Sequence, residues 1–390
     1  MPVGYLIPVL IVAIGTWCAL RPVPSEHPLG RPSYIFGLAA NELPFAAFFW
    51  MLLVPTAMAF AQDDVMDSPG AWGIVALATL TVPGLAVIAH RAWGERDRIE
   101  RAMAEGLGTN WRAEIDADLA EGLRHRPPWL RVLFVPILKR RGDVRRVANL
   151  SYGEAGRRNL LDVYHHRARP QGAPVLIHMH GGHYSGGHKN SQSLPLLYRL
   201  ASRGWVTISA NYRLKPQVRH PEHMIDLKRV IAWAREHAHA YGADPSTLFV
   251  AGSSAGGHMG SIAALTANDP AFQPGFEEAD TSVTGLVVLN GFLGSYWNQG
   301  PESSPLGRAR PDAPPMLIVH GDLDPLVPAD DIREVAEGLR DASGSPVVYA
   351  ELRGGNHAFD LYHSLRFDAV VDAVEAFTAW VRSRERSPRA

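Results

Sequence analysis

The first quarter of the chain carries almost no charge, and this feature most limits what the chain can fold into. Residues 1–90 hold only seven of the 38 basic and 39 acidic side chains of the 390-residue sequence. Three stretches, 2–20, 43–61 and 71–89, have no charged residue and are each 19 residues long. A helix of roughly 20 apolar residues crosses a bilayer core of about 30 Å, whereas buried helices of soluble proteins seldom recur at this length without charge. The sequence therefore predicts three membrane spans, with buried helices of a large soluble domain as the alternative.

The charges that flank these stretches predict an orientation. Arg21 and Arg31 lie between the first two stretches, and arginines recur directly after the third. The intervening loop is acidic and lacks Lys and Arg; its charges are Asp63, Asp64 and Asp67. The positive-inside rule then places the N-terminus outside and the large C-terminal part in the cytoplasm. A cleaved signal peptide would reverse this, but the leading residues carry no basic side chain.

Composition excludes some classes of function. The net charge is −1 and the isoelectric point is near 7.0, which argues against a nucleic-acid binder with a basic face. Cys18 is the one cysteine, so no intrachain disulfide can form, as is usual in a reducing compartment. The length favours a large domain with an appendage. We expect a membrane region at 1–92, a connector at 93–146 and the main domain at 147–390.

The connector is charged and rich in helix-forming residues, and it contains one apolar segment. Residues 127–138 combine a tryptophan with large aliphatic side chains and end in Lys139, Arg140 and Arg141. An apolar segment with a basic flank is typical of a membrane interface. The alternative is an ordinary helix or arm packed on the main domain. Both are compatible with an apolar lip or cap beside a site.

From about residue 147 short apolar runs alternate with helical patterns. Such alternation predicts a mostly parallel sheet with helices on both faces, and a site at the carboxyl ends of the strands. The expected strands are 175–180, 205–210, 248–251, 283–289, 316–320 and 347–352, and the clearest helices are 225–240 and 367–381.

The pentapeptide Gly252–Gly256 has the pattern G-x-S-x-G and stands between an apolar strand and a helix. This context is what a nucleophile elbow needs, because a sharp turn exposes the hydroxyl of Ser254 at its tip. Small flanking residues let the backbone turn without Cβ clashes. The pattern alone is common, so its meaning depends on a base and an acid elsewhere. Ser253 is the alternative nucleophile.

A serine hydroxyl needs an adjacent base, and the base needs an orienting partner. Asp324 follows the expected strand 316–320, and His357 follows the last strand. We expect Ser254, Asp324 and His357 to form a catalytic triad for acyl transfer. Other aspartates near Asp324 are Asp322, which can instead be a turn residue, and Asp330 or Asp331, which can instead cap the next helix. His363 is the alternative to His357.

An oxyanion needs preorganised N–H donors. The sequence His-Gly-Gly-His at 180–183 follows a strand, so the amides of Gly181 and Gly182 are candidates, together with the amide of Ala255. A rival hypothesis makes a metal site of four nearby histidines, but no carboxylate accompanies them, so we expect no metal and no cofactor. These histidines are His178, His180, His183 and His188.

These motifs, in this order, resemble the hormone-sensitive-lipase-like esterases and the related formamidase and acetyl-esterase group. The resemblance covers roughly 147–385 and includes Leu-Asp-Val-Tyr at 161–164 and Asn-Tyr-Arg-Leu at 211–214. It implies the α/β-hydrolase fold, with Ser254, Asp324 and His357 as the triad and Gly181, Gly182 and Ala255 at the oxyanion hole. His183 departs from the family, where many members have a third glycine. The combination with an apolar leader is similar to membrane-associated lipid esterases of actinobacteria.

The sequence thus predicts an α/β-hydrolase preceded by about three transmembrane helices. The expected function is a membrane-anchored serine carboxylesterase or lipase-like hydrolase, and its partners are a small-molecule or lipid ester and a membrane, without nucleic acid. One alternative is an arylformamidase-type amide hydrolase with the same triad. Another is a non-catalytic receptor or scaffold, which would be expected to have lost a triad or oxyanion element.

Overall fold

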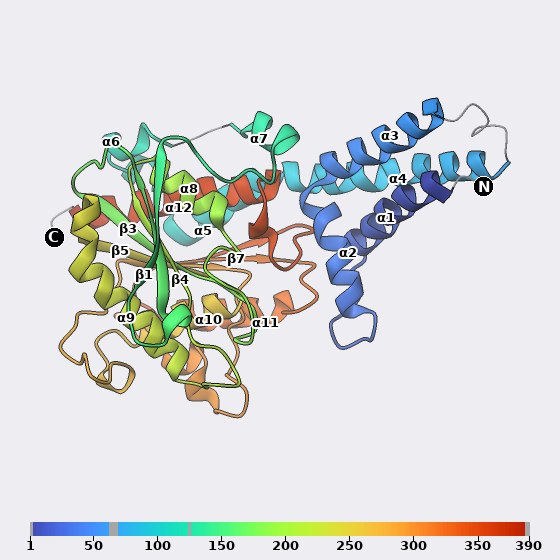
Figure 1. The fold of residues 1–390 in the computed structure, drawn as a ribbon. Coiled ribbons are helices and arrows are strands. Elements are labelled where there is room, and N and C mark those ends of the chain that lie inside the picture. The colour runs from blue at the N-terminus through green and yellow to red at the C-terminus, as the bar shows by residue number, and fades with distance from the viewer. Residues whose placement is uncertain (1–2, 62–68, 124–125, 387–390) are drawn as a thin grey trace.

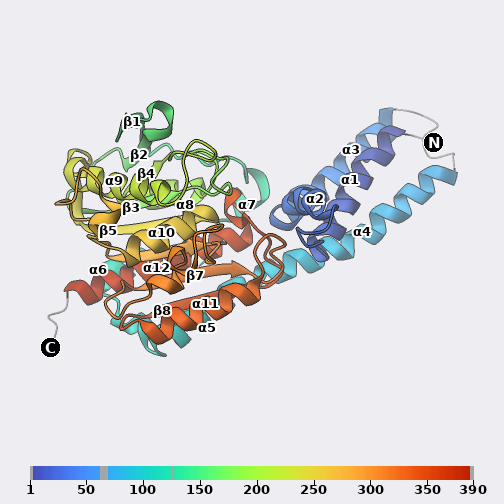
Figure 2. The same ribbon diagram turned by 90° about the horizontal axis from the view of Figure 1, so that it is seen from below.

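The computed structural model describes residues 3–61, 69–123 and 126–386. They form an α/β domain and a group of N-terminal helices that projects from it as an arm (Figure 1). The perpendicular view shows the arm extending away from the α/β domain, with α4 running into that domain (Figure 2). We call it the N-terminal arm.

One eight-stranded sheet organises the α/β domain, in the order β1-β2-β4-β3-β5-β6-β7-β8. The pairs β1–β2 and β2–β4 are antiparallel, and all the other pairs are parallel. The predicted mostly parallel sheet is therefore confirmed. The strands are β1 (Val144–Ser151), β2 (Leu160–His166), β3 (Ala173–Met179), β4 (Val206–Ala210), β5 (Ala243–Ser253), β6 (Gly285–Leu289), β7 (Met316–Gly321) and β8 (Val347–Leu352).

Helices cover both faces of this sheet because its central strands are apolar on both sides. On β3, for example, Val175 and Ile177 pack on one face while Leu176 packs on the other. One face carries α9 (Glu222–His237), α10 (Ala255–Leu265) and α11 (Ala329–Ala342). The opposite face carries α5 (Glu95–Leu107), α8 (Leu194–Ser202) and α12 (Leu365–Arg386).

The connector contributes to this packing. The side chains of Ile99, Met103 and Leu107 recur at every fourth position of α5 and are buried against the sheet face that carries α12. Two short helices follow, α6 (Ala117–Ala120) and α7 (Trp129–Phe134). Around α7 the apolar side chains of Leu130, Phe134 and Ile137 are 75%, 70% and 68% exposed.

The N-terminal arm contains four helices: α1 (Val3–Leu20), α2 (Gly30–Glu42), α3 (Pro44–Ala61) and α4 (Pro69–Trp93). Three of them coincide with the three uncharged stretches. The fourth, α2, falls where the sequence suggested only a loop with two arginines. The acidic residues Asp63, Asp64 and Asp67 lie outside the described residues.

By length and composition, one helix among the described residues suffices to cross a membrane, the continuous rod Pro69–Leu107 formed by α4 and α5. The pair Gly30–Glu42 and Pro44–Leu53, bent by 91°, makes a second if it is counted as one span, and Leu6–Leu20 is a shorter apolar helix. The described residues thus give one or two spans where the sequence predicts three.

Candidate active site

The turn at Gly252–Gly256 joins β5 to α10 and holds Ser254 in a strained conformation, with φ +53° and ψ −119°. Non-glycine residues rarely adopt such a conformation unless their surroundings impose it. A Cβ at Gly252 would lie 2.1 Å from the carbonyl oxygen of Gly256, and a Cβ at Gly256 would lie 2.1 Å from that of Met179. Both positions therefore require glycine, and the backbone crowding forces the Ser254 side chain outward.

The structure brings the three predicted triad residues together. The Nε2 atom of His357 lies 2.9 Å from Oγ of Ser254, and its Nδ1 atom lies 2.6 Å from Oδ2 of Asp324. Oδ1 of Asp324 accepts hydrogen bonds from the amides of Leu326 and Val327, at 2.9 and 3.0 Å. The two backbone donors fix the carboxylate, and the carboxylate in turn fixes the imidazole ring.

Burial acts against the charged forms of both His357 and Asp324, but their mutual attraction outweighs it. The Asp324 carboxylate raises the pKa of His357 above its ordinary value. The imidazole of His357, with His320 and the amide of Val327, lowers the pKa of Asp324. An imidazole of raised basicity beside a hydroxyl is suited to remove the hydroxyl proton.

The rival residues have other contacts. Ser253 is buried and donates to Oδ2 of Asp360 at 2.6 Å. Asp322 accepts from the amide of Gly354 at 2.5 Å, as a turn residue does. His363 is buried beside Asp368, with 3.3 Å between Nδ1 and Oδ2. Asp330 and Asp331 lie in the first turn of α11.

The three amides expected at the oxyanion hole differ in their contacts. The amide of Gly181 donates to Oε1 of Gln192 at 2.6 Å, so this donor is already engaged. Within the described part of the chain, no hydrogen bond is found for the amides of Gly182 and Ala255. Both residues line the cavity beside Ser254. Two of the three expected donors therefore remain available to an oxyanion, and the third holds the loop.

The four histidines of the rival metal hypothesis point to separate partners. His178 lies 3.0 Å from Oγ of Ser253, and burial lowers its pKa to about 3. His180 contacts the carbonyl oxygen of Gly181 at 2.6 Å, and burial lowers its pKa to about 4. His183 packs on Trp297, and Nδ1 of His188 accepts from Asn190. No group of three metal-ligating side chains occurs in the described ranges.

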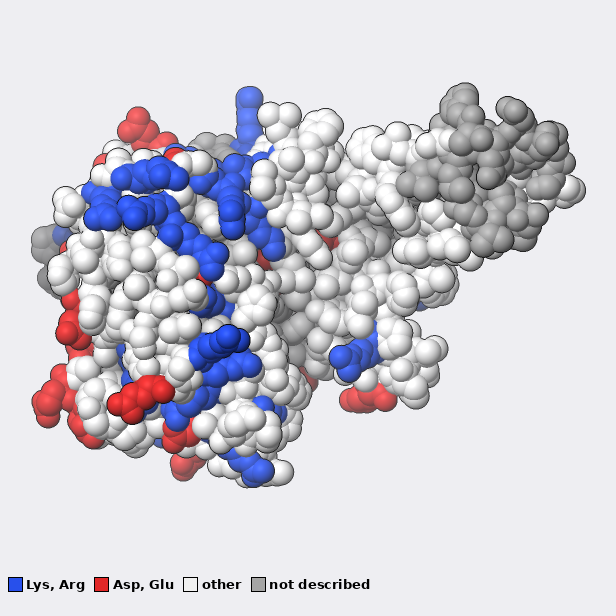
Figure 3. Space-filling model, viewed as in Figure 1, with Lys and Arg blue, Asp and Glu red and all other residues white. Residues whose placement is uncertain are grey.

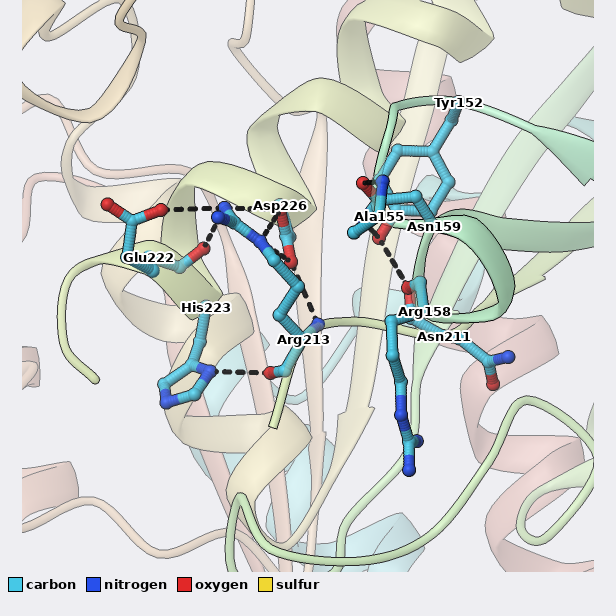
Figure 4. A network of polar contacts seen from close by, with 9 residues as sticks. All are labelled: Tyr152, Ala155, Arg158, Asn159, Asn211, Arg213, Glu222, His223 and Asp226. Atoms are coloured by element: carbon cyan, nitrogen blue, oxygen red, sulfur yellow. Dashed lines mark hydrogen bonds and ion pairs between the residues drawn. The ribbon is translucent and has the colours of Figure 1, made fainter. Parts of the chain in front are cut away.

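The segment after β4 holds the loop of Gly181 and Gly182 in place through a hydrogen bond to the preceding residue, His180. Tyr212 donates its hydroxyl proton to the carbonyl oxygen of His180 at 3.0 Å. The next residue, Arg213, is tied to Asp226 of α9 through its amide (2.9 Å) and its guanidinium (2.8 Å), and it also pairs with Glu222 (Figure 4). This network fixes the backbone on which the glycine loop rests.

A cavity of about 540 Å³ opens above Ser254. Its volume is in the usual range for small-molecule sites. Apolar and aromatic side chains line most of it, and they come from four parts of the chain. They are Tyr34, Phe292, Trp297, Leu326, Val327 and Leu361. No residue of the connector 93–146 belongs to the lining found among the described residues; the N-terminal contribution comes from Tyr34 of α2.

One buried carboxylate near the site has no counterpart in the sequence prediction. Asp360 is fully buried, and its Oδ2 accepts hydrogen bonds from Ser193 and Ser253, each at 2.6 Å. Its Oδ1 accepts a longer bond, 3.4 Å, from Asn290. We call these four residues the Asp360 cluster. It links Ser253, the last residue of β5, to the loop that carries His357.

Comparison with known proteins places this geometry in a family. The family model described as BD-FAE matches residues 161–292. The chain is 34% identical to "Probable carboxylic ester hydrolase LipM" of Mycobacterium tuberculosis, over 99% of this chain and 95% of that protein. "Esterase LipQ" of the same organism is 37% identical over 62% of this chain and 64% of its own length.

Solved structures share the fold. A Thermogutta terrifontis esterase with bound butyrate superposes with a TM-score of 0.53 at 22% identity, covering 64% of this chain and 97% of that one. A truncated carbohydrate esterase from gut microbiota gives 0.52 at 21% identity, covering 60% and 96%. With a full-length relative above 30% identity, the chain belongs to the hormone-sensitive-lipase-like α/β-hydrolase family of carboxylic ester hydrolases, and it is an enzyme that acts on ester bonds.

Proposed function

We propose that this chain is a membrane-anchored serine carboxylesterase of the lipase-like type, which cleaves carboxylic esters through an acyl-enzyme. The observation that carries the proposal is the continuous contact from Ser254 through His357 to Asp324, at 2.9 and 2.6 Å, on the floor of an apolar cavity. Among the residues that the structure describes, Ser253, Asp322 and His363 contact Asp360, Gly354 and Asp368 and not one another, which supports Ser254, Asp324 and His357 as the triad.

In the proposed reaction His357 takes the proton of Ser254 as Oγ attacks the ester carbonyl. The amides of Gly182 and Ala255 donate to the oxyanion that forms. The imidazolium, held by Asp324, then gives its proton to the leaving alcohol, and an acyl group remains on Oγ. A water molecule then attacks the acyl carbon while its proton passes to the same imidazole. The bond from that carbon to Oγ breaks, and Oγ takes the proton back from the imidazolium, which releases the acid and restores the free serine.

Exposed apolar side chains support the membrane anchor. On α1 the side chain of Trp17 is 69% exposed, and on α4 Leu80 is 76% exposed. Apolar surface costs about 25 cal/mol per Å² in water, so a helical arm with this surface belongs in lipid. Trp72 and Trp93, 61% and 62% exposed, stand 21 residues apart on α4. At 1.5 Å per residue they are about 31 Å apart, the spacing of the two aromatic belts of a bilayer.

The distribution of charge supports a cytoplasmic α/β domain. Arg91 lies in the last turn of α4, and Ser25, between Arg21 and Arg31 in the sequence, donates its amide to the carbonyl oxygen of Pro325 at 3.0 Å. The basic loops thus lie on the same side as the α/β domain, which is the inner side by the positive-inside rule. Lys and Arg also gather over the α/β domain in Figure 3, whereas the described part of the arm is mainly uncharged.

The region of α7 fits a position at the membrane surface. Its exposed residues Leu130, Phe134 and Ile137 lie on the segment 127–138, for which the sequence left open an interfacial position or packing on the main domain. The ring of Trp129 lies 5.3 Å from that of Trp93, at the end of α4. The exposed apolar face of α7 therefore continues the apolar surface of the arm.

Covalent labelling of the full chain in detergent with a fluorophosphonate probe tests the nucleophile. We expect labelling of the wild type and of Ser246→Ala, a control in which an exposed hydroxyl at the far end of β5 is removed, and no labelling of Ser254→Ala. Labelled Ser254→Ala would refute the assignment. A series of nitrophenyl esters of increasing acyl length, assayed beside N-formylkynurenine, separates an esterase from a formamidase.

A further inference from the structure

The N-terminal arm does more than adjoin the α/β domain, because the end of α2 is buried in it. Asn41 and Glu42 are 1% and 2% exposed. The side-chain amide of Asn41 donates to the carbonyl oxygen of Gly354 at 3.0 Å, and Arg366 donates to the same oxygen at 3.2 Å. Glu42 pairs with Arg366 and accepts from Ser364 at 2.7 Å. These contacts join parts of the chain more than 300 residues apart.

The residues that α2 contacts stand on both sides of His357. Gly354 precedes it by three residues, in the loop after β8, while Ser364, just before α12, and Arg366, in its first turn, follow it. Gly354 also donates its amide to Asp322, in the loop that carries Asp324. One residue, Gly354, therefore connects α2, the loop of the histidine and the loop of the aspartate through its N–H and its carbonyl oxygen.

Two further contacts come from the same part of the arm. Ser25 donates its amide to Pro325, the residue after Asp324. The ring of Tyr34 on α2 meets the ring of His357 edge to face, with 6.2 Å between centroids, and Tyr34 lines the cavity. Tyr34 and Asn41 are seven residues apart, about two helical turns, so they lie on one face of α2.

The buried ion pair of Glu42 and Arg366 joins two helices at a large cost in desolvation free energy. Both side chains are fully buried, and the loss of hydration of two charges offsets much of their attraction. Apolar residues of similar size commonly give equal or greater stability at such a position. The ion pair and Asn41 instead impose one position on the loop between them, because their hydrogen bonds are directional.

We propose that α2 is a positioning element of the active site: Asn41 and Glu42 hold the loop of His357, and Tyr34 forms the cavity wall next to the imidazole. This inference rests on the function proposed above. On this proposal the N-terminal arm helps to set the position of His357 and the shape of the active-site cavity. Changes in α2 then alter turnover and the choice of ester while Ser254 remains in place.

The test compares Asn41→Ala with Ile35→Ala in the full chain purified in detergent. Ile35 lies on the same helix but is 57% exposed. For Asn41→Ala we expect kcat on a short nitrophenyl ester to fall by about 10- to 100-fold with KM little changed, as for a misplaced catalytic group. Ile35→Ala should match the wild type. Fluorophosphonate should still label all of the Asn41→Ala protein at the end point, only more slowly.

The pH profile separates positioning from a general loss of structure. Asp324 and Asp360 both raise the pKa of His357, and Tyr34 faces the same ring. Neutral His357 is the active base, so kcat/KM rises with pH through this pKa. A loosened contact with Asp324 lowers the pKa, so the acidic limb of Asn41→Ala should move to lower pH. A fall in folded protein alone would leave the limb where it is.

Tyr34 provides a second variant that does not remove a buried hydrogen bond. Tyr34→Ala should shift the preference along the acyl series toward bulkier esters, through KM, and Tyr34→Phe should restore the wild-type order because the ring edge makes the contact. The inference would be overturned if Asn41→Ala and Tyr34→Ala kept the kcat, the ester preference and the acidic limb of the wild type. Labelling of the wild-type protein would still support the proposed function in that case. Absence of wild-type labelling would overturn the proposed function itself.

Discussion

The substitution Asp360→Asn tests whether the Asp360 cluster holds the site together. The carboxylate accepts two hydrogen bonds of 2.6 Å, from Ser193 and Ser253, with no exposure to solvent. Hydrogen bonds to a charged group contribute about 1.5–3 kcal/mol each, and neutral ones about 1 kcal/mol. An amide keeps one acceptor oxygen for the two serines, so each bond weakens by about 0.5–2 kcal/mol and we expect a loss of about 1–4 kcal/mol in the free energy of unfolding. At about 2–4 °C per kcal/mol, the melting temperature should fall by about 2–16 °C.

The assay is thermal melting of the full chain in detergent, with Asp330→Asn as the matched control. The side chain of Asp330 is 88% exposed and pairs with Arg333 on the surface, where such a pair contributes little. Ser253→Ala, combined with Asp360→Asn, completes a double-mutant cycle, and the two changes should be less than additive because both act on the bond between these side chains. Equal melting temperatures for Asp360→Asn and Asp330→Asn, or full additivity in the cycle, would refute the reasoning.

Three further predictions follow from the site and the arm. Asp324→Asn should lower kcat by about 10³- to 10⁴-fold, and its residual kcat/KM should rise with pH at a lower midpoint than in the wild type, because the carboxylate raises the pKa of His357; an unmoved midpoint in a pH-rate profile contradicts this. Gly256→Ala should abolish fluorophosphonate labelling, since its Cβ would lie 2.1 Å from the carbonyl oxygen of Met179, whereas Gly275→Ala, with open space around it, should keep it apart from a small loss of stability at its positive φ. A protease added to intact cells should leave the α/β domain whole and digest it only after lysis; digestion from outside would show that the orientation is wrong.

The sequence predicted the fold because strand ends carry the motifs. Alternating apolar runs gave six of the eight strands, and the parallel sheet is confirmed. Ser254, Asp324 and His357 each lie within five residues of the end of a strand, so the local pattern sufficed to nominate them. Their catalytic roles stay predictions until the variants are measured.

The remainder depends on contacts that leave no local pattern. Asn41 and Gly354 are 313 residues apart, and nothing near either residue marks the pair. The stretch around α2 has two arginines, Arg21 and Arg31, which suggested a loop, although it forms a helix that packs closely on α1 through Gly37 and Ala40. The engagement of Gly181 by Gln192 likewise depends on where an 11-residue loop folds back. Residues at the ends of strands and helices carry a local sequence pattern, whereas the distant side chains that hold them in position do not.

The continuous rod Pro69–Leu107 has a consequence for how the enzyme meets its substrate. Its 39 residues extend for about 58 Å, from the arm to the sheet beside β8. If this long helix spans a bilayer as proposed, it holds the opening of the active-site cavity at a constant distance from the membrane surface. The enzyme would then search in two dimensions, and its rate would follow the number of ester molecules per unit area of membrane rather than their concentration in the surrounding water.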